Sequence, residues 1–419
     1  MKTRLNYIMW YHGLFGSSKR AKKALDFYGG FEKLYEVVKN DADTEGLLKN
    51  FHRTRLTSYS LLDASETIEM CRDMGCNVIS FESEYYPTQL LGISDFPKIL
   101  FYQGDREVLK DEVFVSVVGS RDAPHEALSL TFNAANDMAK AGAVIVSGAA
   151  IGIDIAAHKG AVAAGGATVG VLGCGLGNEY MKRLGSFYDE VCASGVFITE
   201  MMPFAAPSKY SFPERNRIIS GMSHAVLVSC AGEKSGALIT AQTAKKQKRK
   251  VYAVPPDIYP TAGCERLISE GAEALHRTGD ILLPLKEFFT KPFNDEYCDN
   301  EIAVTDVPKE AYSVTAEEKV KQAPKKKPAK EASLKTEKAK RKEKISENKA
   351  KAAETKKELP DYVSDEARRV YLSLSDTKTD INSLVPLTGM PVQTVLSAIS
   401  ELELFGFVKN LPGAMVEKI

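Results

Sequence analysis

The sequence predicts an α/β protein: a doubly wound, mostly parallel β-sheet, preceded by a helical domain and followed by a winged-helix domain. Six short apolar runs between residues 113 and 254 have the composition of buried parallel strands. Helix-length stretches separate most of these runs, which favours right-handed crossovers between parallel strands. Strands are expected at Val113–Val118, Ala143–Val146, Thr168–Leu172, Val196–Thr199, Ala225–Val228 and Val251–Val254. Helices are expected at Glu126–Ala141, Asp154–Ala164 and Ala237–Lys248.

Residues 1–80 are expected to form a helical N-terminal domain of the SAM or helix-hairpin-helix kind. Apolar side chains recur three or four positions apart, at Ala21 and Leu25 and again at Phe31 and Leu34. Glycines between these stretches predict turns that join short helices. Such a unit can be a packing module or can dock on a DNA backbone, and the sequence leaves both interpretations open.

Residues 81–290 are expected to hold the sheet and the binding site. Ligands on a doubly wound sheet bind beyond the carboxyl ends of the strands. The loops that follow the predicted strands are therefore candidate sites. They comprise residues 119–124, 147–154, 173–178, 200–215 and 230–236.

The C-terminal part divides into a linker and a small domain. Residues 291–360 are expected to be a flexible linker, because their second half is rich in Lys, Ala and Glu. Residues 361–419 hold five Lys and Arg against eight Asp and Glu, which favours contact with protein over reading of duplex DNA. This winged-helix domain is expected to have helices at Ser364–Ser373, Asp380–Val385 and Pro391–Phe405, and a hairpin around Pro412-Gly413.

Charge and cysteine content narrow the class of protein. The chain has 55 Lys and Arg and 55 Asp and Glu, but residues 316–358 hold sixteen cations against eight anions, so the remainder is acidic. Seven scattered cysteines without a C-x-x-C pair fit reduced thiols and argue against a disulfide framework or a zinc site. Because no apolar run is long enough for a membrane span, we expect a cytoplasmic protein without metal or membrane contact.

The first two strand-end loops carry small residues suited to phosphate. Gly119, Ser120 and Arg121 follow the first predicted strand. The glycine would let a ligand approach the backbone, and the arginine would add a charged fork. Ser147 and Gly148 stand at the end of the second strand. These five residues are candidates for phosphate contact.

An acid and a histidine follow the second loop. Asp154 is placed to cap the next helix, and His158 lies one turn further on. No nucleophile stands beside them in sequence. A hydrogen bond that locks the helix is therefore favoured over a catalytic pair.

Two glycine-containing loops resemble nucleotide sites without matching them. Lys234, Ser235 and Gly236 open a helix after a strand, but no G-x-x-x-x-G-K-[ST] pattern precedes them, so ATP hydrolysis is not expected. Gly173–Gly177 fails the dinucleotide fingerprint, because Asn178 stands where the third glycine belongs. We therefore expect no cofactor, and keep residues 234–236 as phosphate contacts.

Cations and aromatic residues interleave between residues 209 and 217, a composition typical of sites for single-stranded nucleic acid. Lys209 and Phe212 are suited to follow a phosphate and to stack on a base. Arg215, Asn216 and Arg217 open a helix, so they are candidates either for DNA contact or for tying loops together.

Taken together, these segments resemble the DNA processing protein A (DprA/Smf) family over about residues 84–285. Order and spacing agree along this whole stretch. The matching positions are Tyr86-Pro87, Leu90, Ile93, Asp95, Pro97, Leu100, Gly104, Gly119-Ser120-Arg121, Ser147-Gly148, Gly152-Ile153-Asp154, Ala157-His158, Phe212-Pro213, Arg215-Asn216-Arg217-Ile218-Ile219-Ser220-Gly221, Lys234-Ser235-Gly236 and Ile239-Thr240-Ala241.

The resemblance implies an extended Rossmann-like core that binds single-stranded DNA without sequence specificity and forms a homodimer. It also implies that the protein loads RecA during transformation and recombination, and that it is not an enzyme. The DNA pocket carried over by position consists of Ser120, Arg121, Ser147, Gly148, Lys209 and Phe212.

A second hypothesis is an enzyme or sensor for a small nucleotide, because other Rossmann-like cores bind or cleave nucleotide derivatives. It would use the same loops, with Glu200 or Asp154 as the carboxylate catalyst. Turnover, or nucleotide binding without DNA, would distinguish it from a DNA-binding module.

Overall fold

The structure is a computed structural model, and its contacts divide the chain into two units, Met1–Gln322 and Ala323–Ile419. In the first unit it describes residues 3–49, 51, 56–110, 112–208 and 211–312. In the second it describes residues 365–375, 379–390, 394–395, 398–399, 402, 408–411 and 415–418. The predicted Lys-rich linker therefore lies largely outside the described residues.

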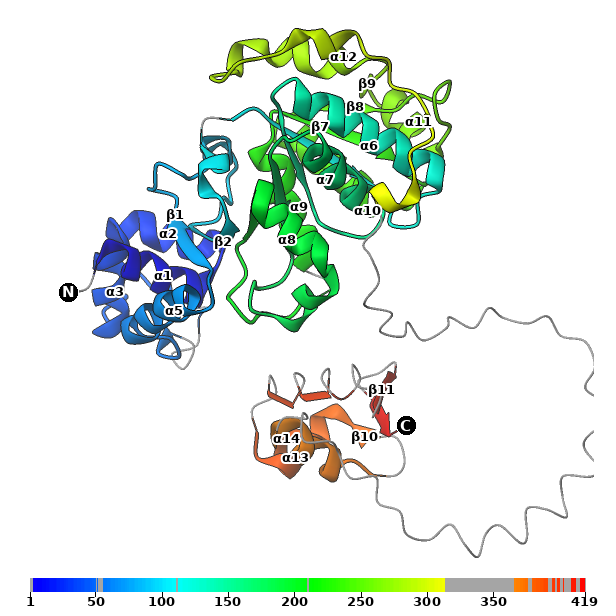
Figure 1. Cartoon of the computed structure of the whole chain (residues 1–419). Helices are drawn as coiled ribbons and strands as arrows, with labels where there is room; N and C mark the ends of the chain where they lie inside the picture. Colours follow the sequence, from blue (N-terminus) through cyan, green and yellow to red (C-terminus); the bar gives the residue numbers. More distant parts are fainter. Residues whose placement is uncertain are drawn as a thin grey trace, which may run out of the picture. The chain divides into compact units, whose positions relative to one another are not determined.

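Nine strands in the described part of the first unit form one sheet, in the order β1-β2-β6-β5-β4-β3-β7-β8-β9 (Figure 1). The strands from β6 to β9 in this order are parallel, whereas β1 and β2 are antiparallel additions at one edge. Their bounds are β1 Asn77–Ser80, β2 Ile99–Gly104, β3 Phe114–Gly119, β4 Val144–Ser147, β5 Thr168–Val171, β6 Gly195–Thr199, β7 Ala225–Cys230, β8 Lys250–Ala253 and β9 Glu273–Ala274.

The order of the strands reverses at β3. Successive strands after it lie to one side as β4, β5 and β6, and the chain then crosses to the other side for β7, β8 and β9. This is the arrangement of a doubly wound sheet, so that prediction is confirmed, and all six predicted strands form. The sequence did not predict β1, β2 or the very short β9.

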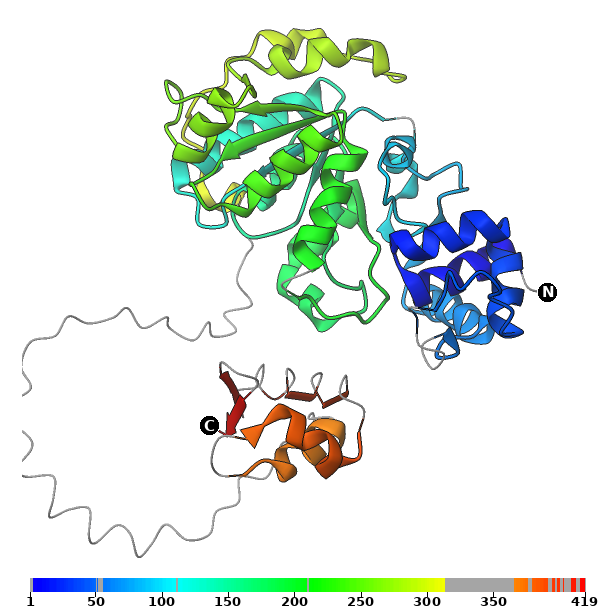
Figure 2. The ribbon, with the colours of Figure 1, turned by 180° about the vertical axis from the view of Figure 1, so that it is seen from behind.

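Helices cover both faces of the sheet (Figure 2). Val115 and Val117 of β3 pack with α6, α7 and α12, whereas Phe114 and Val118 pack with α9, α10 and α11. This alternation is the period of two expected of a strand that is buried on both sides. The helices are α6 His125–Lys140, α7 Ile153–Ala163, α8 Ser186–Ser194, α9 Ser211–Met222, α10 Gly236–Lys246, α11 Ala262–Ser269 and α12 Thr278–Leu282.

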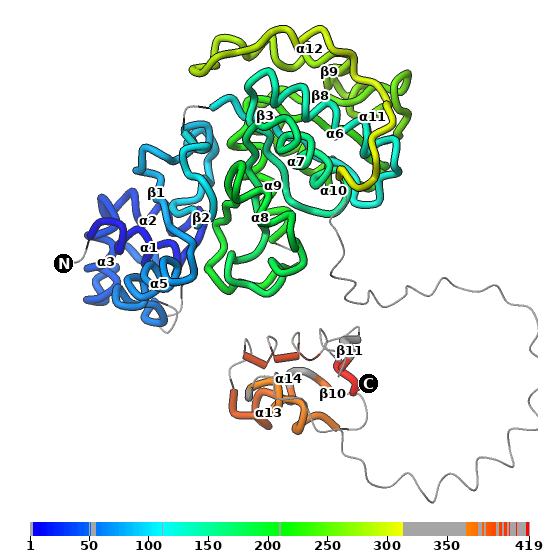
Figure 3. Tube along the Cα trace, viewed as in Figure 1, coloured from blue at the N-terminus to red at the C-terminus, as the bar shows by residue number. Residues whose placement is uncertain are grey.

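The N-terminal helices gather beside β1 and β2 (Figure 3). Trp10 and Leu34 are buried in one apolar cluster with Phe101 of β2 and Phe197 of β6. The helical region thus shares a core with the edge of the sheet, and the boundary expected at residue 80 stays a prediction. These helices are α1 Arg4–Phe15, α2 Lys19–Tyr28, α3 Phe31–Lys39 and α5 Leu61–Asp73.

Short 3₁₀ helices connect the larger elements. None of the helices in the described residues is long and apolar enough to cross a membrane. The 3₁₀ helices are η1 Thr88–Gly92, η2 Arg106–Leu109, η3 Glu179–Leu184, η4 Leu283–Phe288, η5 Asp295–Asp299 and η6 Lys309–Ala311.

The second unit is a small winged-helix domain, as predicted. Its three described strands pair in the order β10-β12-β11, and residues 394–395, 398–399 and 402 of the predicted third helix are helical. Most of the outward residues of that helix lie outside the described residues. The elements are α13 Asp365–Ser373, β10 Thr379–Asp380, α14 Ile381–Thr388, β11 Val408–Leu411 and β12 Met415–Lys418.

Candidate functional site

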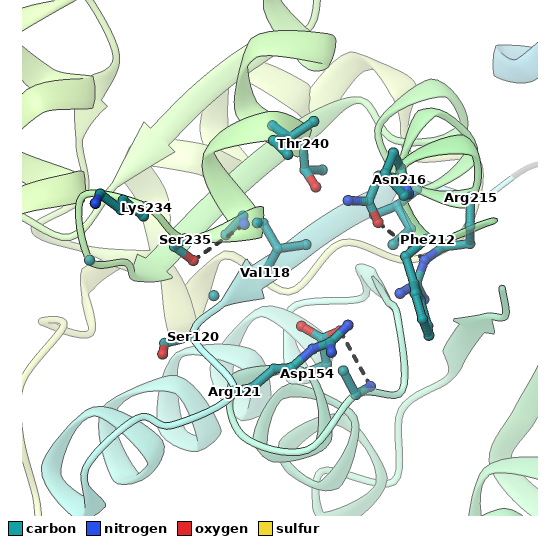
Figure 4. Close-up of a pocket in the computed structure, with 18 residues that line it drawn as sticks. Val118, Ser120, Arg121, Asp154, Phe212, Arg215, Asn216, Lys234, Ser235 and Thr240 are labelled. Atoms are coloured by element: carbon teal, nitrogen blue, oxygen red, sulfur yellow. Dashed lines mark hydrogen bonds between the residues drawn. The ribbon is translucent and has the colours of Figure 1, made fainter. Parts of the chain in front are cut away.

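A pocket of about 610 Å³ opens at the carboxyl ends of β3 and β7, where the strand order reverses. The loops that follow these two strands run to opposite faces of the sheet and leave a crevice between them, which is where doubly wound sheets bind ligands. Residues from four segments line the pocket (Figure 4). They are Val118–Arg121, Ala150, Asp154, Phe212, Pro213, Arg215, Asn216, Ile219, Gly232, Lys234–Ala237, Ile239 and Thr240.

A cation and an aromatic ring meet at this pocket. The Cζ of Arg121 lies 5.1 Å from the centroid of the Phe212 ring. Arg121 is exposed after β3, whereas Phe212 is half-buried in the first turn of α9. A guanidinium over a ring is attracted by the ring's quadrupole and still presents N–H donors to solvent. The pair therefore offers both a stacking surface and an anion contact.

Arg215 holds the floor of the pocket together. Its guanidinium donates to the carbonyl oxygens of Val171 and of Gly148, the latter at 2.6 Å, and its Nε donates to Asn216 at 3.1 Å. These bonds tie α9 to the ends of β4 and β5. Burial lowers the pKa of Arg215, and the charge of Asp154 opposes that shift. Of the two roles left open for Arg215, tying the loops together is the one the contacts show.

Asp154 lines the same floor. It accepts hydrogen bonds from the backbone N–H of Gly148 at 3.2 Å and of Ala150 at 3.4 Å. Burial raises the pKa of Asp154, while Arg215 acts to lower it. The expectation that Asp154 caps α7 was wrong: Gly152 is the N-cap residue, and the carboxylate instead holds the loop before the helix.

His158 takes no part in a pair with Asp154. Its Nδ1 is 2.6 Å from the Thr168 hydroxyl, which itself donates to the Ile145 carbonyl. The histidine nitrogen is therefore the donor, and burial lowers the pKa of the ring to about 3. A neutral core histidine results, so the expected lock between residues 154 and 158 was also wrong.

The N-terminus of α10 forms the opposite rim. The Ser235 hydroxyl accepts from the Ala237 N–H at 3.3 Å and so caps the helix. A Cβ built on Gly236 meets nothing within 4 Å, and Lys234 is exposed (Figure 4). The positive end of the helix dipole and a lysine at one place make a favourable environment for an anion.

The structure brings most of the residues expected in the site to this pocket. Lys209 lies outside the described residues. Ser147 and Gly148 lie behind the lining, where Ser147 donates to the Val117 carbonyl at 2.6 Å. The predicted residues that line the pocket are Gly119, Ser120, Arg121, Phe212, Arg215, Asn216, Lys234, Ser235 and Gly236.

The two strand-end glycines serve packing. A Cβ on Gly119 would lie 2.8 Å from the Cys230 carbonyl oxygen and 2.5 Å from Ile153. A Cβ on Gly148 would lie 2.6 Å from the Arg215 Cζ. A side chain is thus excluded at both positions, and because Gly119 lines the pocket, its contact with a ligand stays a prediction.

Arg217 points away from the pocket. Its guanidinium pairs with the buried Glu200, donates to the Ser17 hydroxyl at 2.7 Å and lies 3.7 Å from Asp95. Burial raises the pKa of Glu200, and Arg217 acts to lower it. The His12 ring donates to the Glu200 carbonyl at 2.7 Å. This cluster joins α1 and the sheet to α9, and the structure thus gives Arg217 a structural role.

Sequence reasoning missed the wall formed by Ile239 and Thr240. Ile239 is 48% exposed although it is apolar, and it stands one turn after Gly236 on α10. Helical spacing from the predicted Lys234–Gly236 segment was the available signal. Among the described residues, no group of three or more His, Cys, Asp or Glu side chains is placed to hold a metal ion.

Two family models match the chain. Residues 77–286 match the model described as DNA recombination-mediator protein A, and residues 350–414 match the DprA winged helix domain. The first covers the whole sheet and the pocket, and the second covers much of the C-terminal unit.

Individual relatives agree with these matches. The DNA processing protein DprA of Bacillus subtilis is 37% identical over 227 residues, which are 53% of this chain and 76% of that protein. Protein Smf of Synechocystis is 28% identical over 338 residues, which are 80% and 78% of the two chains. The X-ray structure of DNA processing protein A from Streptococcus pneumoniae superposes with a TM-score of 0.57 at 30% identity and covers 68% of this chain and 98% of that one.

Proposed function

Because the chain belongs to the DNA recombination-mediator protein A (DprA/Smf) family, we propose that the pocket at the carboxyl ends of β3 and β7 binds single-stranded DNA. We propose further that it binds without sequence specificity and acts as a binding protein, with no catalytic step of its own. The family is named for mediation of recombination, so the partner of the bound strand would be a recombinase such as RecA.

One observation carries the proposal: the Arg121 guanidinium and the Phe212 ring meet at one pocket. An unpaired base can stack on the ring, because every base has a π-face, and the arginine can contact the adjoining phosphate. A base inside a duplex cannot reach such a ring without leaving its stack. The geometry thus favours single strands over duplexes.

A second phosphate contact is available across the pocket. Lys234 and the first N–H groups of α10 lie on the rim opposite Arg121 (Figure 4). Cations on both rims suit a backbone that crosses the pocket, since each neutralised phosphate releases counterions and adds to affinity. We propose Lys209, which precedes Phe212 in sequence, as a further phosphate contact.

Other parts of the proposal rest on family membership and charge alone. We propose that the protein acts in the cytoplasm, that it forms a homodimer through the Rossmann-like core and that it loads RecA during DNA uptake. The winged-helix domain, with its excess of acidic residues, would contact protein.

The nucleotide-enzyme hypothesis has one supporting observation, since the carboxylate of Asp154 lines the pocket. Its oxygen, however, accepts two backbone hydrogen bonds and faces the charge of Arg215, so it is engaged in holding the loop. The other proposed catalyst, Glu200, is paired with Arg217 outside the pocket. The arrangement favours binding over chemistry.

Fluorescence anisotropy on the full chain tests the proposal. Labelled single strands should bind more tightly than duplexes of the same sequence, and free mononucleotides should compete weakly. The log–log dependence of affinity on salt should have a slope of roughly −0.7 per phosphate contacted. Equal affinity for duplex and single strand, or hydrolysis of a nucleotide without DNA, would contradict it.

A further inference from the structure

A recess lies at the turn between α1 and α2, outside the pocket described above. Ser17, Ser18, Lys19 and Lys22 line it from the α2 side, and Ser94, Asp95, Phe96 and Lys98 line it from the loop before β2. We call these eight residues the α2 recess. On α9, Phe212 and Arg215 face the pocket, whereas Arg217 reaches Ser17 beside the recess. The two places are therefore separate sites.

The charge at the start of α2 is unusual for a helix. Four cations, Lys19, Arg20, Lys22 and Lys23, stand in its first five residues, and no acid lies in the first turn. Ser18 caps the helix by accepting from the Ala21 N–H at 3.4 Å. The N-terminus of a helix carries partial positive charge, so cations there repel it. An anion bound at this end would remove that repulsion.

Lys98 supplies an independent sign of a missing anion. The residue is only 8% exposed, and its Nζ lies 3.1 Å from the centroid of the Phe96 ring. In the part of the chain that the structure describes, no carboxylate lies within 4 Å of that ammonium group. Burial lowers the pKa of Lys98 to about 8, the charge of Lys22 adds to that effect, and the charge of Asp26 opposes it. A buried cation that has no carboxylate at ion-pair distance is costly, and a bound anion would compensate it.

The nearby acids are already engaged. Asp26 forms an ion pair with Lys22 at 2.7 Å, and Asp95 lies 3.7 Å from Arg217. Lys19, Arg20 and Lys23 are exposed and follow one another along α2. Cations spread along a helix suit a polyanion with repeating charges better than they suit one small enclosed ion.

We propose that the α2 recess binds a backbone phosphate of a nucleic-acid strand, with Lys98 contacting it from below and the exposed cations of α2 following the neighbouring phosphates. The site gives the helical N-terminal region a part in holding DNA. It is independent of the pocket, so long nucleic acids engage both and short ones engage the pocket alone.

The test uses the full chain and two matched pairs of substitutions. Lys19→Gln with Lys23→Gln removes two charges from α2, and Lys33→Gln with Lys39→Gln removes two exposed charges from α3 in the same region. Lys98→Met removes the buried ammonium and keeps an apolar stem of similar length. Anisotropy is measured over a range of salt with single strands of about 6 and about 30 nucleotides and with a duplex of the longer length.

For the longer strands, the α2 pair and Lys98→Met should each weaken binding several-fold and make the salt slope shallower by about 0.7 per phosphate lost. The α3 pair should leave both quantities unchanged, and affinity for the short strand should survive in every variant. An equal effect of the α2 and α3 pairs would overturn the proposal, since it would show only a change in net charge. Competition by inorganic phosphate at constant ionic strength, abolished in Lys98→Met, would also overturn it in favour of a free-anion site.

Discussion

The guanidinium of Arg121 lies over the ring of Phe212, with 5.1 Å between Cζ and the ring centroid. The arginine follows β3 and the phenylalanine opens α9, so only the reversal of strand order at β3 brings them to one pocket. This contact joins the two chemical properties that single-stranded DNA requires, a cation for phosphate and a face for a base.

Replacing each of the two side chains by alanine should therefore change the affinity for single strands in a different way. Arg121→Ala should weaken binding of single strands and make the salt slope shallower by about 0.7, because one phosphate contact is lost. Phe212→Ala should weaken binding by about 1–3 kcal/mol and leave the slope unchanged, because stacking involves no counterion. Anisotropy at several salt concentrations separates the two effects.

Arg72→Ala is the control for the arginine, since Arg72 is an exposed residue in the last turn of α5, outside the pocket. If Arg121→Ala and Arg72→Ala changed affinity equally, the effect would be one of net charge. If Phe212→Ala altered the slope as much as Arg121→Ala, stacking could not be its role.

Gly148, behind the pocket lining, and Gly236, on the rim, should respond in opposite ways to substitution by alanine. In Gly148→Ala the new Cβ would lie 2.6 Å from the Arg215 Cζ, so the guanidinium must move and its bonds to β4 and β5 weaken. We expect a loss of stability of about 1–3 kcal/mol, the range for overpacking a well-filled site. Urea denaturation followed by circular dichroism measures it.

Gly236→Ala is the matched comparison, because nothing lies within 4 Å of its Cβ position. Stability should stay constant or rise by up to about 1 kcal/mol, as for glycine to alanine in a helix. Affinity for single strands should nevertheless fall if a phosphate approaches the N-terminus of α10 there. A variant with unchanged affinity would place the phosphate elsewhere on the rim.

The sequence predicted the sheet well because its central strands carry a local signal. Each of the six is a short apolar run, and burial on both faces leaves no ambiguity about its place in the core. Of the two antiparallel strands, β1 lies at the edge of the sheet and has only one buried residue in four, so it depends on the partner that reaches it and no local pattern reveals it. The other strand, β2, lies between β1 and β6 and begins with four buried apolar residues, Ile99–Tyr102, a local signal that the prediction missed.

The sequence predicted which loops meet at the pocket better than it predicted what the individual residues in those loops contact. Position after a strand correctly brought Arg121, Phe212 and Lys234 to one pocket. The packing of Gly119 and Gly148 could not be predicted, because their neighbours, Ile153 and Arg215, come from other segments. The opposite directions of Arg215 and Arg217 follow from the phase of α9, which is fixed only once its packing against β3 and the N-terminal helices is known.

Arg217 and Glu200 provide a test of structural against ligand-binding roles. Arg217→Ala should cost about 3–5 kcal/mol, because it leaves the buried Glu200 carboxylate without its partner. The double variant Arg217→Met with Glu200→Gln should recover part of that loss, since neither charge then remains. Chemical denaturation of the three proteins measures the loss and the recovery. The affinity of the folded variants for single strands should match that of the parent protein. A loss of affinity without a loss of stability would instead assign Arg217 to the DNA site.

Stability should fall in acid because three core histidines are held neutral. Burial lowers the pKa of His12 and His224 to about 4 and of His158 to about 3. Above about pH 6.5 these rings are neutral in both states and stability is fully present. As the pH falls toward 4, only the unfolded chain gains the protons, so each ring removes up to about 1.4 kcal/mol per pH unit.

The Nδ1 of His224 accepts from the Phe114 N–H at 3.1 Å, and Asn can supply an acceptor there without titrating. Urea midpoints measured between about pH 7 and 5 should therefore fall less steeply in His224→Asn than in the parent protein, and parallel curves would show that His224 contributes nothing to the acid sensitivity.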